Sequence, residues 1–324
     1  MPKMNIIQAV NSALINAMEG DDSVVILGED IGRFGGVFRA TVDLQERFGE
    51  SRVIDTPLSE GGIIGSAIGM ALNGLTPIAE IQFVDFIFPG FDQIVNEAAK
   101  MRYRSGGEWT CPMVIRSPYG GGIKGGHYHS QSPEAHFTHT PGLKVVIPSN
   151  PYDTKGLLLT SIEDPDPVIF LEPKRVYRAS QGEVPAEAYK IPLGKANIVR
   201  EGTDITVVAW GAMVHEAQTA VDQAAEAGID CELIDLRSLL PWDAETVVES
   251  VKKTGRCVVV YEAPRTSGFG GEIMAQLVED AFDYLEAPIM RVTGFDTPFP
   301  YTLEHEYLPT AKRILPVIQK TASY

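Results

Sequence analysis

Cysteine is scarce in this 324-residue sequence, and the three cysteines, Cys111, Cys231 and Cys257, are far apart. Because no two of them form a Cys-x-x-Cys pair, the sequence predicts neither a disulfide framework nor a thiolate zinc site, which is typical of a reducing compartment. Basic residues are also few: 27 Lys and Arg face 43 Asp and Glu, so the net charge is −16. This balance argues against nucleic acid as a partner and favours a basic protein or a cationic cofactor.

Long apolar runs are missing as well, so the sequence predicts no membrane-spanning segment. The first five residues lead directly into a predicted helix with Ile6, Val10 and Leu14 on one face, without the pattern of a signal or transit peptide. We therefore expect a cytoplasmic protein. No internal repeat and no low-complexity tract interrupts the chain.

The pattern of apolar segments predicts two parallel α/β domains, the second smaller than the first. In the first, predicted strands at 24–27, 77–83, 112–116, 145–148 and 168–171 alternate with helices at 41–48, 59–73, 91–104 and 154–162. A looser stretch from 172 to 203 is the predicted linker. In the second, strands at 205–210, 231–236, 257–261 and 289–292 alternate with helices at 214–227, 243–253 and 271–284.

The helix predicted at 59–73 has an unusual surface. Ser59 is a suitable N-cap, and apolar residues from Ile63 to Leu72 recur at helical spacing. A second stripe has almost no side chains; it consists of Gly62, Gly65, Ser66 and Gly69. Since each glycine costs a helix about 1 kcal/mol relative to alanine, we expect another helix or a ligand to approach closely. Glu60, at the helix start, either interacts with the helix dipole or points at such a ligand.

Three further stretches could border a site. Gly28-Glu29-Asp30 follows a predicted strand, where α/β sheets bind ligands. An aromatic stretch contains Phe83, Phe86, Phe88 and Phe91, interrupted by Pro89 and Gly90, and is either core or part of a site. The turn at Ser161, Asp164 and Asp166 could hold a structural cation, although such a sequence is more often only a turn.

The glycine-rich stretch from Gly120 to Gly126 matches G-x-G-x-x-G, but no helical pattern follows it, so we reject a dinucleotide fingerprint. A loop bordering a site is the better interpretation. Four of the six histidines lie here or just beyond, at His127, His129, His136 and His139. Their spacing is a weak zinc pattern, and a histidine that titrates or donates a proton is the preferred hypothesis.

Several of these motifs together resemble one family, the β subunit of the thiamine-diphosphate-dependent 2-oxo acid dehydrogenase component of the large multienzyme complexes. The matching segments are Gly28–Asp30, Asp55–Glu60, Glu80–Phe83, Arg102–Gly107, His129–Ser132, Pro148–Leu158 and Arg291–Pro298. They are distributed over nearly the whole chain. The segment His127–Phe137 is more similar to branched-chain (2-oxoisovalerate) enzymes than to pyruvate enzymes.

The resemblance implies a transketolase-like architecture, with a pyrimidine-binding domain at 1–187 and a transketolase C-terminal domain at 188–324. It also implies an α2β2 heterotetramer that binds thiamine diphosphate between its α and β subunits. The sequence lacks the Gly-Asp-Gly motif that this superfamily uses for the diphosphate and Mg²⁺. The α subunit is therefore expected to hold that half of the cofactor and most of the Mg²⁺ contacts. K⁺ is a further expected ion.

The resemblance also assigns roles to individual residues. Glu60 matches the carboxyl group that hydrogen-bonds the pyrimidine ring and favours its imino tautomer, while the cofactor carries the chemistry. Gly61-Gly62 follows where relatives vary, so we expect a looser start of this helix. His129 matches the histidine that faces the substrate and the lipoyl group as a proton donor or acceptor. Phe83 and Phe86 are assigned to the substrate side. The positions expected to contact the cofactor are Glu29, Leu58, Ser59, Glu60, Gln82, Phe86, Ile87, Phe88 and Pro89.

The resemblance implies oxidative decarboxylation of a branched-chain 2-oxo acid and reductive acylation of the lipoyl group of a dihydrolipoyl acyltransferase. Pyruvate and acetoin dehydrogenase β subunits are the alternatives within this class. A non-catalytic subunit that only docks the acyltransferase core is an alternative of another class. It would not need both Glu60 and His129. A self-sufficient synthase of the same superfamily is disfavoured by the chain length and the missing diphosphate motif.

Overall fold

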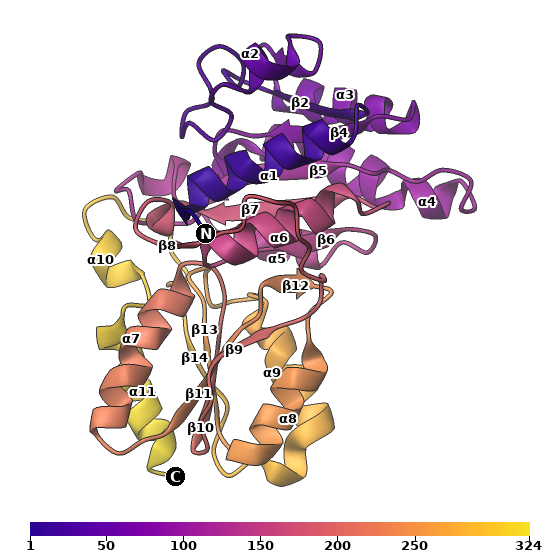
Figure 1. Cartoon of the computed structure of the whole chain (residues 1–324). Coiled ribbons are helices and arrows are strands. Elements are labelled where there is room, and N and C mark those ends of the chain that lie inside the picture. Colours follow the sequence, from indigo (N-terminus) through magenta and orange to yellow (C-terminus); the bar gives the residue numbers. More distant parts are fainter. The chain divides into compact units, whose positions relative to one another are not determined.

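A computed structural model describes residues 1–324, which form two compact units (Figure 1). Unit 1 comprises Met1–Tyr119 and His136–Leu193, and unit 2 comprises Gly120–Ala135 and Gly194–Tyr324. Each unit has a mainly parallel β-sheet with helices packed on it, which confirms the expected α/β fold class with two parallel sheets. None of the helices combines the length and the apolar character needed to cross a membrane.

Six strands of unit 1 lie side by side in the order β6-β7-β5-β4-β2-β3, and all neighbouring pairs are parallel. Their apolar, β-branched residues are buried on both faces, as expected for a parallel sheet between helices. A separate antiparallel pair joins β1 to β8. The strands are β1 (Lys3–Asn5), β2 (Val24–Gly28), β3 (Val53–Asp55), β4 (Thr76–Glu80), β5 (Val114–Tyr119), β6 (Lys144–Val146), β7 (Val168–Pro173) and β8 (Gln181–Glu183).

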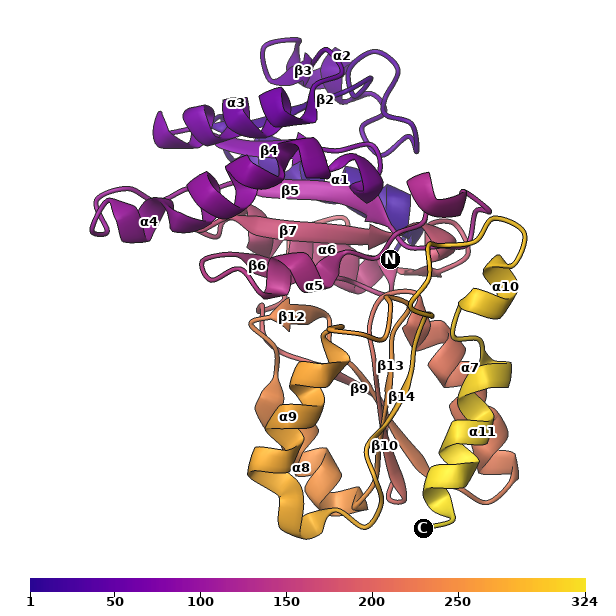
Figure 2. The same cartoon turned by 180° about the vertical axis from the view of Figure 1, so that it is seen from behind.

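Helices α1 and α6 pack together on one face of this sheet, and α3 lies on the other, as Figures 1 and 2 show from opposite sides. Local sequence fixes the helix starts: Asn5 and Gln8 form a capping box for α1, and Asn150 caps α6 ahead of Pro151. The helices are α1 (Ile6–Gly20), α2 (Leu44–Phe48), α3 (Glu60–Leu72), α4 (Met101–Arg104), α5 (Glu134–Thr138) and α6 (Pro151–Ile162).

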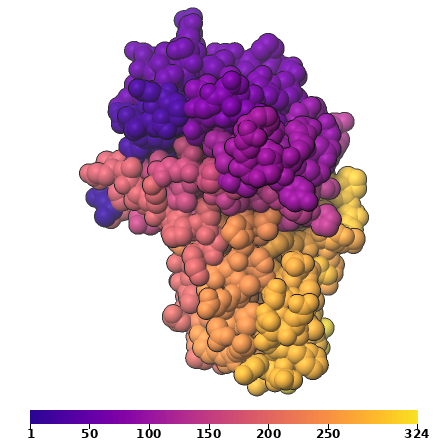
Figure 3. Space-filling model, turned by 90° about the vertical axis from the view of Figure 1, so that its right-hand side faces the viewer, coloured from indigo at the N-terminus to yellow at the C-terminus, as the bar shows by residue number.

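Unit 2 has a five-stranded sheet in the order β14-β13-β10-β11-β9, with only β9 antiparallel to its neighbour. Helices α7 and α11 cover one face and α8 and α9 the other; Figure 3 shows a side where the orange to yellow part of this unit is exposed. The elements are β9 (Asn197–Arg200), β10 (Ile205–Ala209), α7 (Met213–Glu226), β11 (Cys231–Asp235), β12 (Ser238–Leu240), α8 (Ala244–Thr254), β13 (Cys257–Val260), α9 (Gly270–Ala281), β14 (Met290–Val292), α10 (Glu304–Tyr307) and α11 (Ala311–Ala322).

The structure corrects three predicted elements. The helix expected at 91–104 is broken into a π-helical turn η3 (Gln93–Glu97), a 3₁₀ turn η4 (Ala98–Lys100) and α4. The strand expected to reach residue 83 ends at Glu80, and two 3₁₀ turns follow, η1 (Val84–Phe86) and η2 (Phe88–Gly90). The helix expected from residue 41 begins only at Leu44. The sequence analysis also did not predict β1, β8, β9, β12, α5, α10 or α11.

The polar residue Glu80, on the predicted strand at 77–83, belongs to a buried ion network in the unit 1 sheet. Arg116 Nη1 donates to Glu80 Oε2 at 2.7 Å, and Arg116 Nε donates to Glu172 Oε1 at 2.7 Å. The Tyr177 hydroxyl donates to the other Glu172 oxygen at 2.6 Å. Arg116 and Glu172 are fully buried, so their charges depend on each other for compensation. Through Glu80, the network reaches the carboxyl end of β4.

Replacing Arg116 with Met should lower the free energy of unfolding by about 3–5 kcal/mol, because two carboxylates would remain buried without their cation. Urea unfolding followed by circular dichroism measures this loss. Arg104→Met is the matched control, since Arg104 pairs with Glu97 at the surface and should cost less than about 1 kcal/mol. Equal losses for the two variants would contradict the importance assigned to the buried network.

Candidate functional site

The carboxyl ends of three adjacent strands of unit 1 place the predicted site residues along one edge of the sheet. Gly28, the last residue of β2, pairs with Asp55 at the end of β3 and with Glu80 at the end of β4. Glu29 follows β2 directly, the segment to Glu60 follows β3, and Gln82 follows β4. This is the edge at which open α/β sheets bind ligands.

Two half-buried carboxylates, those of Glu29 and Glu60, face the same region of this edge. Burial raises the pKa of Glu29, and the negative charges of Glu60 and Asp30 raise it further. Glu60 is therefore close enough to Glu29 for their charges to interact. Gln82 Nε2 donates to Asp30 Oδ2 at 3.2 Å and so links the ends of β4 and β2. This edge is here called the carboxylate edge because it has the carboxylates of Glu29, Asp30, Asp55 and Glu60. Such an edge suits a cationic or hydrogen-bond-donating ligand.

The start of α3 is packed directly against another backbone. Ser59 is at the N-cap position as predicted, but its side chain makes no capping hydrogen bond. A Cβ added at Gly90 in η2 would lie 3.2 Å from the Glu60 carbonyl oxygen and 3.0 Å from Ile64 Cγ1. A Cβ at Gly61 would lie 3.1 Å from the Pro89 carbonyl oxygen. This close contact holds the backbone of Glu60 against η2.

The rest of the glycine stripe on α3 is open in this chain. A Cβ at Gly65 or at Gly69 would meet nothing within 4 Å, and Ser66 is exposed. The close packing partner that the sequence predicts for this stripe is therefore not another part of the same chain. Gly90, whose contact with α3 is close, was not predicted as a site residue. The only sequence signal for it was its place after Pro89 in the aromatic stretch.

Aromatic and apolar side chains border the carboxylate edge. Phe83 packs edge-on against Phe86 at 5.9 Å between ring centroids, and Phe38 packs edge-on against Phe83 at 5.4 Å. Two large apolar side chains are unusually open, with Leu58 78% and Phe88 40% exposed. Pro89 is exposed as well, whereas Ile87 is fully buried, so an Ile87 contact with any cofactor would have to use its main chain. The exposed apolar residues at this edge favour a ligand or partner that covers them.

The four clustered histidines are divided between the units. His127 and His129 belong to unit 2, and His136 and His139 to unit 1. The half-buried His129 donates its backbone N–H to the Gly126 carbonyl at 3.3 Å, while the rings of His127 and Tyr128 are 4.0 Å apart. His136 packs edge-on against Phe88 and Phe91. The structure contains no cluster of three or more His, Cys, Asp or Glu side chains arranged for a metal ion, so it gives no support to a zinc site.

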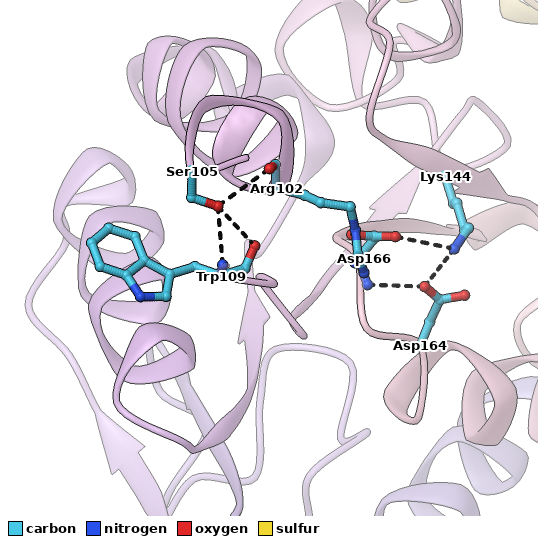
Figure 4. Close-up of polar contacts among 6 residues, drawn as sticks. All are labelled: Arg102, Ser105, Trp109, Lys144, Asp164 and Asp166. Carbon is cyan, nitrogen blue, oxygen red and sulfur yellow. Dashed lines mark hydrogen bonds and ion pairs between the residues drawn. The ribbon is translucent and has the colours of Figure 1, made fainter. Parts of the chain in front are cut away.

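The turn predicted as a possible cation site is occupied by cationic side chains (Figure 4). Lys144 Nζ donates to Asp164 Oδ1 at 2.5 Å, and Arg102 Nε donates to Asp166 Oδ1 at 2.8 Å. The Ser161 hydroxyl donates to the Leu157 carbonyl within α6. A cation here would have to displace these partners or use main-chain carbonyls. The cation at Ser161, Asp164 and Asp166 stays a prediction.

Unit 2 contains a buried acid that the sequence did not indicate, Glu134, near the predicted histidine. Its side chain is fully buried, and its Oε1 accepts a hydrogen bond from Trp210 Nε1 at 3.3 Å. Burial raises the pKa of Glu134 from 4.5 to about 8, and the nearby Glu262 acts in the same direction. Glu134 is therefore mostly neutral in the folded protein at pH 7.

Glu134 should make the protein less stable as the pH rises from about 4.5 to about 8, because the folded state keeps a proton that the unfolded state releases. Glu134→Gln removes this dependence. Its melting temperature should match the wild type near pH 5 and exceed it by several degrees at pH 8, measured by differential scanning fluorimetry. Glu226→Gln, at an exposed helix position, is the control. A difference between Glu134→Gln and wild type that does not change with pH would contradict this assignment.

Two family models match the chain: "Transketolase, pyrimidine binding domain" at residues 2–180 and "Transketolase, C-terminal domain" at residues 194–314. The chain is 60% identical to "2-oxoisovalerate dehydrogenase subunit beta, mitochondrial" of Dictyostelium discoideum, covering 99% of this chain and 87% of that protein. It is 53% identical to "Pyruvate dehydrogenase E1 component subunit beta" of Acholeplasma laidlawii, covering 99% of both.

Among solved structures, the chain is similar to "Split gene transketolase, inactive beta4 tetramer", with a TM-score of 0.82. The alignment covers 99% of this chain and 98% of that one, at 23% sequence identity. At this identity the likeness establishes the fold alone. It agrees with the two parallel sheets described above.

Proposed function

The chain belongs to the family of 2-oxo acid dehydrogenase β subunits, and we propose that it is the β subunit of a branched-chain 2-oxo acid dehydrogenase. In this role it works with an α subunit in an α2β2 assembly. The assembly decarboxylates the 2-oxo acid oxidatively and transfers the acyl group to the lipoyl group of a dihydrolipoyl acyltransferase. The observation that carries the proposal is the position of Glu60, at the start of α3 on the carboxylate edge.

The residues at this edge fit one half of thiamine diphosphate. The combination of a half-buried carboxylate at the start of α3 with the aromatic residues that follow β4 suits an aminopyrimidine ring, which has a flat apolar face and polar nitrogens. The same edge does not suit a diphosphate, because Glu29, Asp30, Asp55 and Glu60 would repel it. This contrast supports a cofactor shared between subunits, with the diphosphate and its Mg²⁺ held by the α subunit.

The roles of this chain's own groups follow from their positions. When bound, thiamine diphosphate supplies the nucleophilic carbon that reacts with the 2-oxo acid. The Glu60 carboxyl group would hold a proton against the outer nitrogen of the pyrimidine ring. Burial and the nearby charge of Glu60 raise the pKa of Glu29, so Glu29 keeps a proton more readily than an exposed glutamate does. Leu58, Phe88 and Pro89 would cover the cofactor and exclude water from it.

His129 is proposed to act at the substrate and lipoyl side as a proton donor or acceptor. Gln82 and Ser59 are proposed cofactor contacts, and Ile87 contributes its main chain. The net charge of −16 supports docking of a basic segment of the acyltransferase. K⁺ as a further ion and a cytoplasmic location both stay predictions.

A pyruvate dehydrogenase β subunit is the second candidate. The observation that favours it is the 53% identity to the Acholeplasma laidlawii protein. Assaying the assembled α/β enzyme with pyruvate and with 3-methyl-2-oxobutanoate separates the two. The proposal predicts a higher kcat/KM for 3-methyl-2-oxobutanoate, and a preference for pyruvate would replace it with the second candidate.

The shared cofactor site predicts that this chain alone binds thiamine diphosphate weakly. Isothermal titration calorimetry with Mg²⁺ present should give little heat for the isolated chain and clear binding after the α subunit is added. The α subunit alone is the control, since it too should bind more weakly than the assembly. Tight Mg²⁺-dependent binding by the isolated chain would contradict the proposal of a shared site.

A further inference from the structure

The loop Gly120–Ser130, here called the glycine–histidine loop, needs external contacts to keep one conformation. It contains five glycines as well as His129. Gly120, Gly122 and Gly126 have positive φ angles, and so does Lys124 at 55°, which is unfavourable for a residue with a side chain. Such a loop loses much conformational entropy when it is ordered. The position of His129 therefore depends on the residues outside the loop that hold it, here called its anchors.

The first anchor is Glu262, which comes just after β13 and is buried. The Gly121 backbone N–H donates to Glu262 Oε2 at 2.9 Å. The fit beside it is close, because a Cβ at Gly120 would lie 2.5 Å from Glu262 Oε1. The carboxylate thus holds the beginning of the loop through its main chain.

The second anchor is Glu304, the first residue of α10, which is also buried. The Lys124 backbone N–H donates to Glu304 Oε2 at 3.0 Å. This bond holds the one non-glycine residue of the loop that has a left-handed conformation. Hydrogen bonds from N–H groups to carboxylates are about twice as strong as those between neutral groups.

Close packing against neighbouring side chains also restrains the loop. A Cβ at Gly121 would lie 2.6 Å from Phe299 Cζ, and the nearest atom to a Cβ at Gly126 belongs to Tyr301, 3.8 Å away. The contact continues to the histidine, since a Cβ at Gly125 would lie 2.5 Å from His129 Cβ. A shift of the anchored backbone would therefore be passed on to His129.

We propose that Glu262 and Glu304 are positioning residues that fix the glycine–histidine loop and, through it, the side chain of His129. The proposal rests on the function proposed for His129. The two carboxylates are distant from the loop in sequence, and each accepts a hydrogen bond from a different backbone N–H of the loop. The loop's own residues therefore do not supply these two acceptors. Each carboxylate acts through the main chain of the loop and takes no part in the chemistry itself.

Limited trypsin digestion of the full chain tests the anchoring without any catalytic assay. Glu304→Met removes the acceptor but keeps the side-chain length, and should speed cleavage after Lys124 about tenfold or more, read from intact masses of the two fragments. Glu304→Gln keeps an acceptor oxygen and should fall between Met and wild type. Glu306→Met, in the same short helix but exposed, is the matched control and should cleave like the wild type. Unchanged cleavage in Glu304→Met would overturn the proposal.

The second measurement is acyl transfer to a lipoyl domain by the assembled α/β enzyme. Glu304→Met should raise the KM for the lipoyl domain or lower kcat at least several-fold, and Glu304→Gln should restore part of the rate. Faster cleavage with normal acyl transfer would overturn the positioning role. If His129→Ala also leaves acyl transfer normal, it is the function proposed for His129 that fails; an impaired His129→Ala assigns the failure to the anchors. Glu262→Gln, which keeps an acceptor, should behave like Glu304→Gln.

Discussion

The variant Glu60→Gln of the assembled α/β enzyme should lose activity by orders of magnitude while its melting temperature barely changes. Glutamine has nearly the same shape, so the contact of the α3 start with Gly90 and Pro89 is kept. The amide cannot exchange a proton with a pyrimidine nitrogen, so the proposed role is lost. Removal of one negative charge at a helix N-terminus should cost only about 0.3–1 kcal/mol of stability.

A carboxylate that merely interacts with the helix dipole predicts the opposite result. Glu60→Gln would then be slightly less stable and would turn over normally. Glu245→Gln is the matched control, because Glu245 occupies the first turn of α8 and is exposed. It should show that small stability loss with full activity. Equal activity in Glu60→Gln and Glu245→Gln would contradict the catalytic assignment.

His129→Ala should slow acyl transfer to the lipoyl domain by roughly a hundredfold or more, the usual cost of losing a positioned acid or base. Decarboxylation measured with an artificial electron acceptor should be affected less, because Glu60 and the carboxylate edge are intact. The two assays on one preparation separate these steps.

His127→Ala is the control for His129→Ala. His127 lies on the same loop two residues earlier, is exposed, and its ring lies tilted against that of Tyr128. It should keep nearly full acyl transfer. If His127→Ala and His129→Ala are impaired to the same extent, the loop as a whole is responsible. Full turnover of His129→Ala with the lipoyl domain as acceptor would show that the assigned role is wrong.

Sequence periodicity was enough to predict the two parallel sheets, because Val, Ile and Leu runs at strand spacing alternate with helical patterns. It also located Glu60 at a helix start and Glu29 just after a strand, since both positions follow from local signals. The interaction between these two carboxylates requires β2 and β3 to be neighbours, and strand order is not encoded locally.

Other features depend on tertiary contacts that no local pattern encodes. The segment Gly120–Ala135 belongs to unit 2 although it lies within the sequence of unit 1, and Glu262 and Glu304 accept hydrogen bonds from it there. The break of the helix at 91–104 into π and 3₁₀ turns has no proline or glycine within it to announce it. The partner of Glu80, Arg116, is on the neighbouring strand of the sheet, 36 residues later in the sequence.

Hydrogen–deuterium exchange at the thiazolium carbon measures directly whether Glu60 activates the cofactor. The measurement uses the assembled α/β enzyme with thiamine diphosphate and Mg²⁺, quenched in acid and read by proton NMR. Exchange in Glu60→Gln should be slower than in the wild type by orders of magnitude, with Glu245→Gln unchanged. Exchange as fast in Glu60→Gln as in the wild type would contradict the role of Glu60 in cofactor activation.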